Sequence, residues 1–499
     1  MLLMSLMLLC VKKIKRLTPK VSQKTFRMQR LLLVWMMILA TAQVSFAQQA
    51  EKMTGRWYGV VNANNEHLRV VINLTPRTGK LTGTIAFPDK SPEIKNLDSV
   101  SLNAGILFLR LHTADLVYIG KVNPDADNIS GKLIWGNINQ DVTLTHKEIK
   151  QAALYPRPQE PKPPYAYNTE EVSFRNDADS VRLAGTFVRP SGFTANYPVM
   201  VMIPGEGPQN RDNEVSYHKM FLVMADYFAK NGIATLRFDK RGVGGSGGNA
   251  DSVDIHGTAR DAAAAVRYLK SRRDVDPHSI GVLGYGAGAA SAQILAADNP
   301  TIAFVISMAG IGVNGMEWWE QQQLTAARAM GMSDDEYATA NARMKPYWDA
   351  LLAEKPLAAT RADAKLALEH IYDSLPAELK DATDKEQFSG ADIVSPEMLS
   401  ILRYKPVSYL RRIQCPFMAV NGAMDEVVLA EPNLKGLERG LIENGNMMVT
   451  IRKFAGLNHL FQSCKTCDAE EYATLEQTID PLVPEFIAHW ILQLPPVGR

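Results

Sequence analysis

The stretch Gly284-Tyr285-Gly286-Ala287-Gly288-Ala289 decides the fold, because it joins an apolar strand to an Ala-rich helix. The residues before it, Ile280 to Leu283, are apolar enough for a strand that is buried on both faces. Other apolar runs lie at 199–203, 233–238, 303–306 and 417–420, and helical stretches at about 217–230, 257–272, 287–297 and 430–443. This alternation predicts an α/β fold, with a mostly parallel sheet covered by helices on both faces.

The corner has the spacing of a nucleophile elbow. In such a turn from strand to helix, small residues stand two positions before and after a central residue, because larger side chains would collide there. The amino end of the following helix also helps to hold negative charge. The central residue of a working elbow is Ser, Cys or Asp, whereas here it is Gly286. We therefore expect the corner to be present without its attacking group.

The same residues also fit a dinucleotide-binding pattern. Gly284, Gly286 and Ala289 satisfy the spacing G-x-G-x-x-G/A. That pattern requires an acidic residue about twenty positions later, at the end of the next strand. The next expected strand ends at Ile306 to Gly310 without an acid. A dinucleotide-binding oxidoreductase is therefore the least favoured of three functional hypotheses. The other two concern hydrolysis and are given below.

Two polar residues at expected strand ends complete the hydrolytic pattern. Asp425 follows the apolar run 417–420, and His459 follows a strand expected around 449–454. The chain order of elbow, acid and histidine is typical of α/β-hydrolases. Asp425 would hold His459 in one tautomer, and His459 would take the proton from the attacking group. Each residue alone is also explained by a role in its loop, and the shared order favours the pair.

Three further motifs carry a resemblance to a known family. The segment 237–244 (RFDKRGVG) resembles the D-K-R-G-x-G signature of bacterial α/β-hydrolase esterases related to the serine aminopeptidase and dienelactone-hydrolase groups. The segment 205–212 (GEGPQNRD) resembles that family's G-S-G-P-Q-D-R-D loop. Residues 456–462, 471–472 and 478–481 resemble its C-terminal signature, so the resemblance covers about 170–495.

The resemblance implies an α/β-hydrolase domain over 169–499, with a helical cap inserted at about 312–400. It also implies carboxylic-ester hydrolysis without a metal or organic cofactor, on a small ester-like or acyl ligand. The catalytic positions would be Gly286, Asp425 and His459. The backbone of Glu206, Gly207 and Ala287 would form the oxyanion hole.

The chain departs from the family where the chemistry would take place. The elbow lacks its serine at Gly286, and Glu206 replaces a serine of the oxyanion loop. A carboxylate beside a developing oxyanion repels it unless the carboxylate points away. We expect a catalytically impaired protein that keeps a ligand pocket. The alternative is an active hydrolase in which His459 activates water, or in which another nucleophile acts.

Substitute nucleophiles are hard to find near the elbow. Ser291 lies five positions further along the helix and faces another direction. Ser246 lies in a Gly-rich loop where forming the turn is its simpler role. Tyr285 would point away from the side to which Gly286 points. None of these three residues replaces the missing serine on sequence grounds.

The chain before the hydrolase domain has a different pattern. Residues 48–150 contain six to eight short stretches with period-two alternation, which predict a small antiparallel all-β domain, either a barrel or a sandwich. The resemblance extends to this part, since many exported members carry such a domain. Five prolines between Tyr155 and Pro164 predict a stiff linker over 151–168.

The N-terminus predicts export to the periplasm or the extracellular space. Residues 28–47 have the basic start, short apolar core and small residues of a signal peptide, and residues 1–27 form an extension before it. We expect no membrane span after cleavage. Without residues 1–47, 46 basic residues stand against 53 acidic ones, which argues against nucleic-acid binding. Cys464 and Cys467 form either a local disulfide or two free thiols. The oligomeric state stays open.

Overall fold

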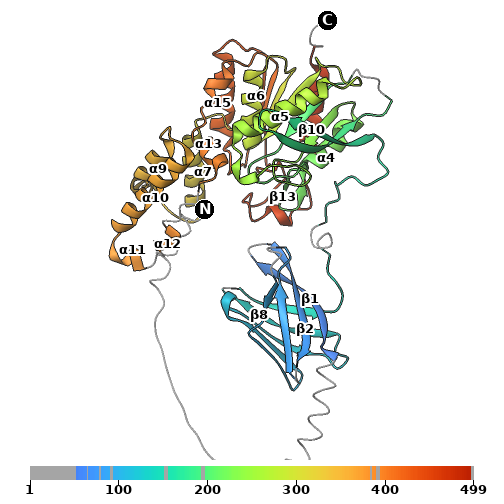
Figure 1. Cartoon of the computed structure of the whole chain (residues 1–499), viewed down its shortest axis with the longest axis vertical. Coiled ribbons are helices and arrows are strands. Elements are labelled where there is room, and N and C mark those ends of the chain that lie inside the picture. Colours follow the sequence, from blue (N-terminus) through green and yellow to red (C-terminus); the bar gives the residue numbers. More distant parts are fainter. Residues whose placement is uncertain are drawn as a thin grey trace, which may run out of the picture. The chain divides into compact units, whose positions relative to one another are not determined.

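The computed structural model describes residues 52–63, 66–77, 80–89, 94–136, 138–150, 156–192, 197–381, 385–388 and 394–495. The predicted N-terminal extension and signal peptide, residues 1–47, lie outside the described residues. The described chain forms two compact units, one ending at Pro156 and one beginning at Arg157 (Figure 1). Each unit is described by itself.

The first unit is an antiparallel β-barrel. Its strands are β1 Gly55–Ala63, β2 Glu66–Arg77, β3 Lys80–Ala86, β4 Ile94–Asn96, β5 Ser99–Asn103, β6 Ile106–Leu111, β7 Leu116–Val122, β8 Asn128–Trp135 and β9 Ile138–Thr145. Each strand pairs with its sequence neighbour except β4 with β5, and β1 also pairs with β9. The predicted all-β domain is therefore confirmed.

A bent strand closes this barrel. Only Leu97 and Asp98 separate β4 from β5. The Leu97 N–H donates to the carbonyl of Gly83 in β3, and the Asp98 N–H donates to that of Arg110 in β6, both at 2.9 Å. Because the two halves of one strand pair with opposite ends of the sheet, the sheet closes on itself. Alternate side chains fill its interior, among them Trp57, which is fully buried.

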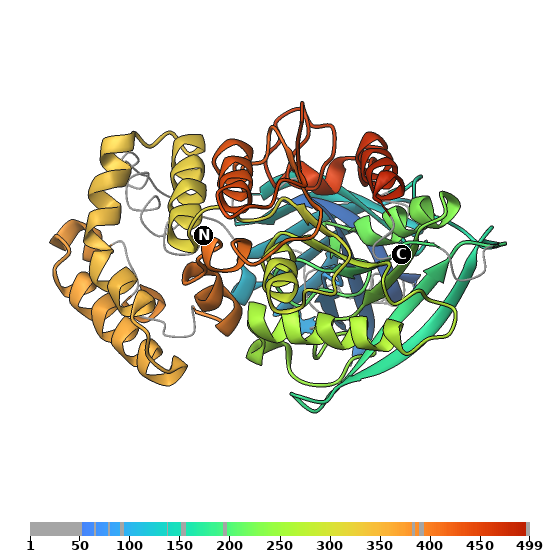
Figure 2. The same cartoon turned by 90° about the horizontal axis from the view of Figure 1, so that it is seen from above.

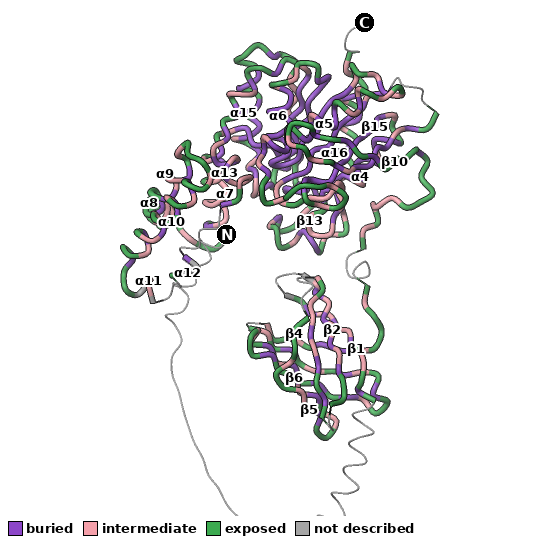
Figure 3. The backbone as a smooth tube through the Cα atoms, viewed as in Figure 1, coloured by how far each residue is buried: buried purple, intermediate pink, exposed green. Residues whose placement is uncertain are grey.

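The second unit contains an eight-stranded sheet in the order β10-β11-β15-β12-β16-β17-β18-β19. Its strands are β10 Asn168–Asn176, β11 Val181–Arg189, β12 Val199–Ile203, β15 Ala234–Phe238, β16 Ile280–Tyr285, β17 Val305–Met308, β18 Phe417–Gly422 and β19 Val449–Phe454. The last six strands in this order, from β15 onward, run parallel, whereas β10 and β11 are antiparallel. Five neighbouring strands of the sheet are buried along their whole length, namely β15, β12, β16, β17 and β18 (Figure 3).

Helices cover both faces of this sheet, as predicted. One core cluster holds side chains of α5 Ile255–Lys270, α6 Ala287–Asp298 and α15 Ala430–Ile442. A second cluster holds those of α4 Met220–Lys230 and α16 Leu482–Gln493. Since burial of apolar surface is the main favourable term in folding, these two layers hold the sheet in place.

The predicted helical insertion lies between β17 and β18. It consists of α7 Gly315–Ala329, α8 Asp334–Arg343, α9 Lys345–Leu352, α10 Leu357–Asp373, α11 Ala377–Asp381, α12 Lys385–Phe388 and α13 Pro396–Leu402. Most of these helices stand to one side of the sheet (Figure 2). They share a small apolar core of their own, which includes Tyr347, Leu368 and Phe388. Helix α13 brings the chain back toward the ends of the parallel strands.

The start of the proline-rich segment is bound to the second unit. The Arg157 guanidinium donates to the backbone carbonyls of Leu475 at 2.9 Å and Ala473 at 2.8 Å. The Gln159 side chain accepts from the Thr478 N–H at 2.6 Å and donates to the Ile479 carbonyl at 2.7 Å. These contacts fix Arg157 and Gln159 on the C-terminal segment that carries part of the family signature.

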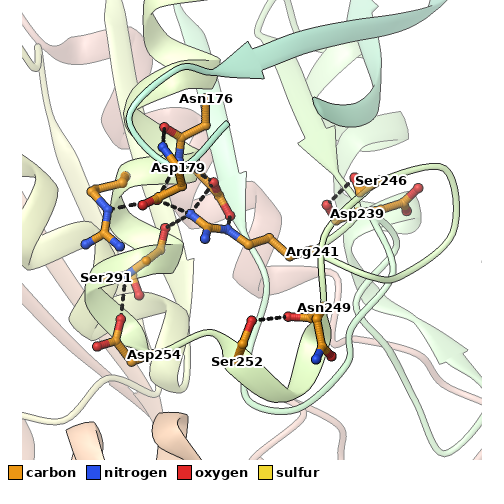
Figure 4. Close-up of polar contacts among 12 residues, drawn as sticks. Asn176, Asp179, Asp239, Arg241, Ser246, Asn249, Ser252, Asp254 and Ser291 are labelled. Carbon is orange, nitrogen blue, oxygen red and sulfur yellow. Dashed lines mark hydrogen bonds and ion pairs between the residues drawn. The ribbon is translucent and has the colours of Figure 1, made fainter. Parts of the chain in front are cut away.

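Arg241 of the quoted motif anchors the loop after β15 (Figure 4). Its Nε donates to Asp261 Oδ2 at 2.6 Å, and its guanidinium also contacts Asp179. Asp261 is 2 % exposed and also accepts from the Asn176 amide at 2.7 Å. A buried carboxylate needs such partners because leaving it unpaired is costly. Arg241 therefore has a structural role.

Replacing Arg241 by Met should destabilise the second unit by about 3–5 kcal/mol, because the buried Asp261 loses its cation. Arg260→Met is the matched control, since Arg260 also contacts Asp179 but its side chain is 49 % exposed. Exposed pairs contribute about 0–1 kcal/mol. Urea unfolding followed by far-UV circular dichroism measures both effects. Equal losses in the two variants would contradict the structural role of Arg241.

Candidate active site

The predicted corner is present between β16 and α6. Gly286 has φ 54° and ψ −122°, a backbone conformation that residues other than glycine rarely adopt. A Cβ on Gly284 would lie 2.2 Å from the carbonyl oxygen of Gly288, and one on Gly288 would lie 2.4 Å from that of Ile203. The two flanking glycines are therefore required by packing, and the elbow geometry persists without its side chain.

The acid and the histidine meet beside this corner. Asp425 follows β18 and His459 follows β19, and both are buried. Asp425 Oδ1 accepts from the N–H groups of Val427 and Val428, both at 2.8 Å. Asp425 Oδ2 accepts from His459 Nδ1 at 2.8 Å. Since an ionised carboxylate only accepts, this bond places the Nδ1 proton on His459 and leaves Nε2 as the ring's acceptor.

Tyr285 connects the elbow to the histidine loop. Its hydroxyl donates to the backbone carbonyl of His459 at 3.3 Å, and the two ring centroids are 5.1 Å apart. Burial raises the pKa of Tyr285 well above its ordinary value. Tyr285 therefore stays neutral, and its hydroxyl positions the histidine loop.

The side chain of Glu206 occupies the space next to Gly286. An ideal Cβ on Gly286 would lie only 2.6 Å from Glu206 Oε2. The same oxygen accepts a hydrogen bond from the Ala287 N–H at 3.3 Å. The carboxylate thus lies where the side chain of a serine nucleophile would begin. The sequence left open whether this carboxylate points away from the site, and the structure shows that it does not.

A second carboxylate reaches the site from α13. Glu397 Oε2 accepts from the Gly207 N–H at 2.7 Å, and Glu397 Oε1 contacts Lys240 Nζ at 2.5 Å. Lys240 Nζ also donates to the carbonyl of Gly205 at 3.1 Å. Sequence reasoning missed both residues of this ion pair. Lys240 lies inside the quoted D-K-R-G motif, whereas nothing in the pattern around Glu397 indicates its place.

Two of the three backbone groups of the predicted oxyanion hole, those of Gly207 and Ala287, are therefore in contact with carboxylates. Gly207 N–H donates to Glu397, and Ala287 N–H donates to Glu206. An oxyanion hole works by presenting donors to the charge that develops in the transition state. In this arrangement those donors already hold negative charge, so a developing oxyanion would have to displace it.

The pKa of His459 is raised by its surroundings. Burial alone lowers it, but the charge of Asp425, the hydrogen bond to Asp425 and the charge of Glu206 together raise it above its ordinary value. The imidazole therefore keeps its proton to a higher pH than a free histidine does. A protonated His459 cannot act as a general base.

The two serines considered as substitutes have structural partners (Figure 4). Ser291 Oγ donates to the carbonyl of Ile255 at 2.9 Å and is buried. Ser246 Oγ donates to the carbonyl of Asp239 at 2.8 Å and accepts from the Ala184 N–H at 3.0 Å. Ser246 thus holds its loop, which is the simpler role that the sequence suggested, and Ser291 holds the start of α5.

Other features bear on cofactors and on the cell compartment. Cys464 and Cys467 form a disulfide, one of the two predicted alternatives. Within the described ranges, no group of three or more His, Cys, Asp or Glu side chains is arranged to hold a metal ion. A search of the same ranges for a helix of the length and apolarity needed to cross a membrane finds none.

Fold and site together define an α/β-hydrolase of the esterase or peptidase type. Residues 179–439, slightly more than half of the chain, match the X-Pro dipeptidyl-peptidase family (S15 family), and the chain belongs to this family. The resemblance to α/β-hydrolase esterases inferred from the sequence is thereby confirmed.

Two named relatives are similar to this chain. The quorum-quenching protein AidA of Acinetobacter baumannii is 25% identical over 265 residues, which cover 52% of this chain and 80% of AidA. Esterase EstD of Thermotoga maritima is 24% identical over 370 residues, covering 73% of this chain and 79% of EstD.

Among solved structures, the α/β-hydrolase GrgF from Penicillium sp. sh18 is 19% identical, with 59% of this chain and 91% of GrgF covered and a TM-score of 0.37. Est1E from Butyrivibrio proteoclasticus, with bound ferulic acid, is 16% identical. The match covers 64% of this chain and 98% of Est1E, with a TM-score of 0.38.

We predict that Glu206→Gln lowers the pKa of His459, because the charge of Glu206 is one of the causes that raise it. NMR titration of the histidine side chains measures this shift, with His459→Asn to assign the signal. Glu317→Gln is the control, since Glu317 is exposed on α7. An unchanged midpoint in Glu206→Gln would show that the carboxylate does not act on His459.

Proposed function

We propose that this chain is a carboxylic-ester hydrolase by descent that has lost ordinary serine esterase catalysis and keeps a pocket for a small ester-like or acyl ligand. The observation that carries the proposal is the position of Glu206 Oε2, 2.6 Å from where a Cβ of residue 286 would stand. With Glu206 in this side-chain conformation, its carboxylate and a nucleophilic side chain on residue 286 cannot both occupy this space.

Three features of the site support the loss of catalysis. Gly286 supplies no attacking atom, and removal of a triad member elsewhere leaves only roughly 10³–10⁴-fold catalysis over water. The N–H groups of Gly207 and Ala287 donate to carboxylates. The hydroxyls of Ser246 and Ser291 donate to backbone carbonyls. The esterase chemistry of the family therefore lacks both its nucleophile and its open anion site here.

A second candidate is hydrolysis by water that His459 activates. The intact hydrogen bond between Asp425 and His459 favours it, since this bond orients the imidazole for proton transfer. Such activity needs neutral His459, so its rate would rise with pH through the raised pKa of that residue. The dinucleotide-binding hypothesis gains no support from the site.

We propose further that the protein acts outside the cytoplasm. The support is the signal-peptide pattern of residues 28–47 and the disulfide between Cys464 and Cys467, because disulfides persist in oxidising compartments.

The decisive test restores the serine and removes the carboxylate together. Wild type should give no fluorophosphonate adduct and hydrolyse a p-nitrophenyl butyrate substrate at close to the background rate. Gly286→Ser alone should restore little, because its side chain meets Glu206. In Gly286→Ser/Glu206→Ser we expect labelling and turnover that His459→Ala abolishes.

Glu206→Ser alone is the matched control, since it frees the space without supplying a nucleophile at the elbow. Two results would overturn the proposal. The first is fluorophosphonate labelling of the wild-type chain. The second is wild-type ester turnover that is equal to that of the double variant and is lost in His459→Ala.

A further inference from the structure

We propose that the Gly207 N–H and the Lys240 ammonium form a carboxylate-binding cradle that Glu397 now fills. The ligand of the site is then an organic acid whose carboxylate takes the place of Glu397. This inference rests on the proposed function, because it assigns a chemical class to the ligand of the same pocket.

The contacts of Glu397 are those of a bound carboxylate. Each of its two oxygens has its own donor, Lys240 Nζ at 2.5 Å for Oε1 and the Gly207 N–H at 2.7 Å for Oε2. Short distances of this kind are typical of charge-assisted hydrogen bonds, which are about twice as strong as neutral ones. The two donors therefore recognise a planar anion with two oxygens.

Because the cradle is buried, its Lys240 ammonium needs a negatively charged partner. Lys240 is 3 % exposed, and its ammonium makes one ion pair within the described residues, the one with Glu397. Its further contact, with the carbonyl of Gly205, carries no compensating charge. A buried cation without a counterion is strongly unfavourable. When the Glu397 side chain leaves, the cradle therefore requires another anion.

The occupant and the cradle belong to different parts of the unit. Gly207 and Lys240 lie in loops that follow β12 and β15 of the sheet, whereas Glu397 belongs to α13 of the helical insertion. The amino end of α13 is capped by Ser395, whose Oγ accepts from the Met398 N–H at 3.0 Å. Rotation of the Glu397 side chain consequently leaves the cap of its helix intact.

The cradle adjoins the candidate active site along the chain. Gly207 directly follows Glu206, which lies against the elbow and holds the Ala287 N–H. Exchange of Glu397 for a ligand carboxylate leaves the net charge of the site unchanged, so Glu206 adds no new repulsion. A neutral ester or amide of the same shape cannot neutralise Lys240 in this way.

Fluorine NMR with trifluoroacetate as the probe tests the cradle, and trifluoroacetamide is its neutral counterpart. Glu397→Ala should bind trifluoroacetate at least about tenfold more tightly than wild type, as expected for a hydrogen-bonded charge pair. Trifluoroacetamide should show no such gain. Glu317→Ala on α7 is the matched control and should bind both probes as wild type does.

The role of Lys240 is tested in the Glu397→Ala background. Lys240→Met should abolish the gain for trifluoroacetate, whereas Lys240→Arg should retain most of it, and circular dichroism checks that each variant is folded. The proposal is overturned if Glu397→Ala binds both probes equally, or if the gain survives Lys240→Met in a folded protein. These binding readouts are independent of ester turnover and of fluorophosphonate labelling, so failure here leaves the proposed function standing and the two failures can be told apart.

Discussion

The site depends on one close approach: with Glu206 turned inward, its carboxylate lies 2.6 Å from where a Cβ on residue 286 would stand. The tight corner at Gly286 is fixed by packing, since Gly284 lies against backbone atoms of α6 and Gly288 lies against the backbone at the end of β12. With no Cβ at the corner, the Glu206 side chain can turn inward and meet the Ala287 N–H at the start of α6. The strained backbone of the corner therefore borders a carboxylate.

The inward-turned carboxylate of Glu206 adds a negative charge beside the hydrogen-bonded pair of Asp425 and His459. Asp425 and Glu206 both favour the protonated form of His459, so at a given pH less of the imidazole is in the neutral form that can accept a proton than in a free histidine. Two predicted oxyanion donors, the N–H groups of Ala287 and Gly207, already donate to Glu206 and Glu397. These contacts are the reason that we propose binding of a ligand rather than stabilisation of a transition state.

The sequence predicted those parts of the structure that follow from local pattern. The apolar runs gave the strands of the parallel sheet, period-two alternation gave the barrel strands, and chain order placed Asp425 beside His459. The contacts of Glu397 could not be predicted, because the insertion carries it to Gly207 from 190 residues away along the chain. The direction of the Glu206 side chain also escaped prediction, since it depends on the space beside Gly286 rather than on any spacing.

The closure of the β-barrel limits how this unit can meet other molecules. Because β4 and β5 act as one bent strand between β3 and β6, the two ends of the described sheet are joined by main-chain hydrogen bonds. This joining leaves less room at the bend for a partner to add a strand, which is a common mode of peptide recognition. Recognition by this unit is left to the side chains of its outer surface and to its turns, where sequence can change without disturbing the hydrogen-bonded ladder.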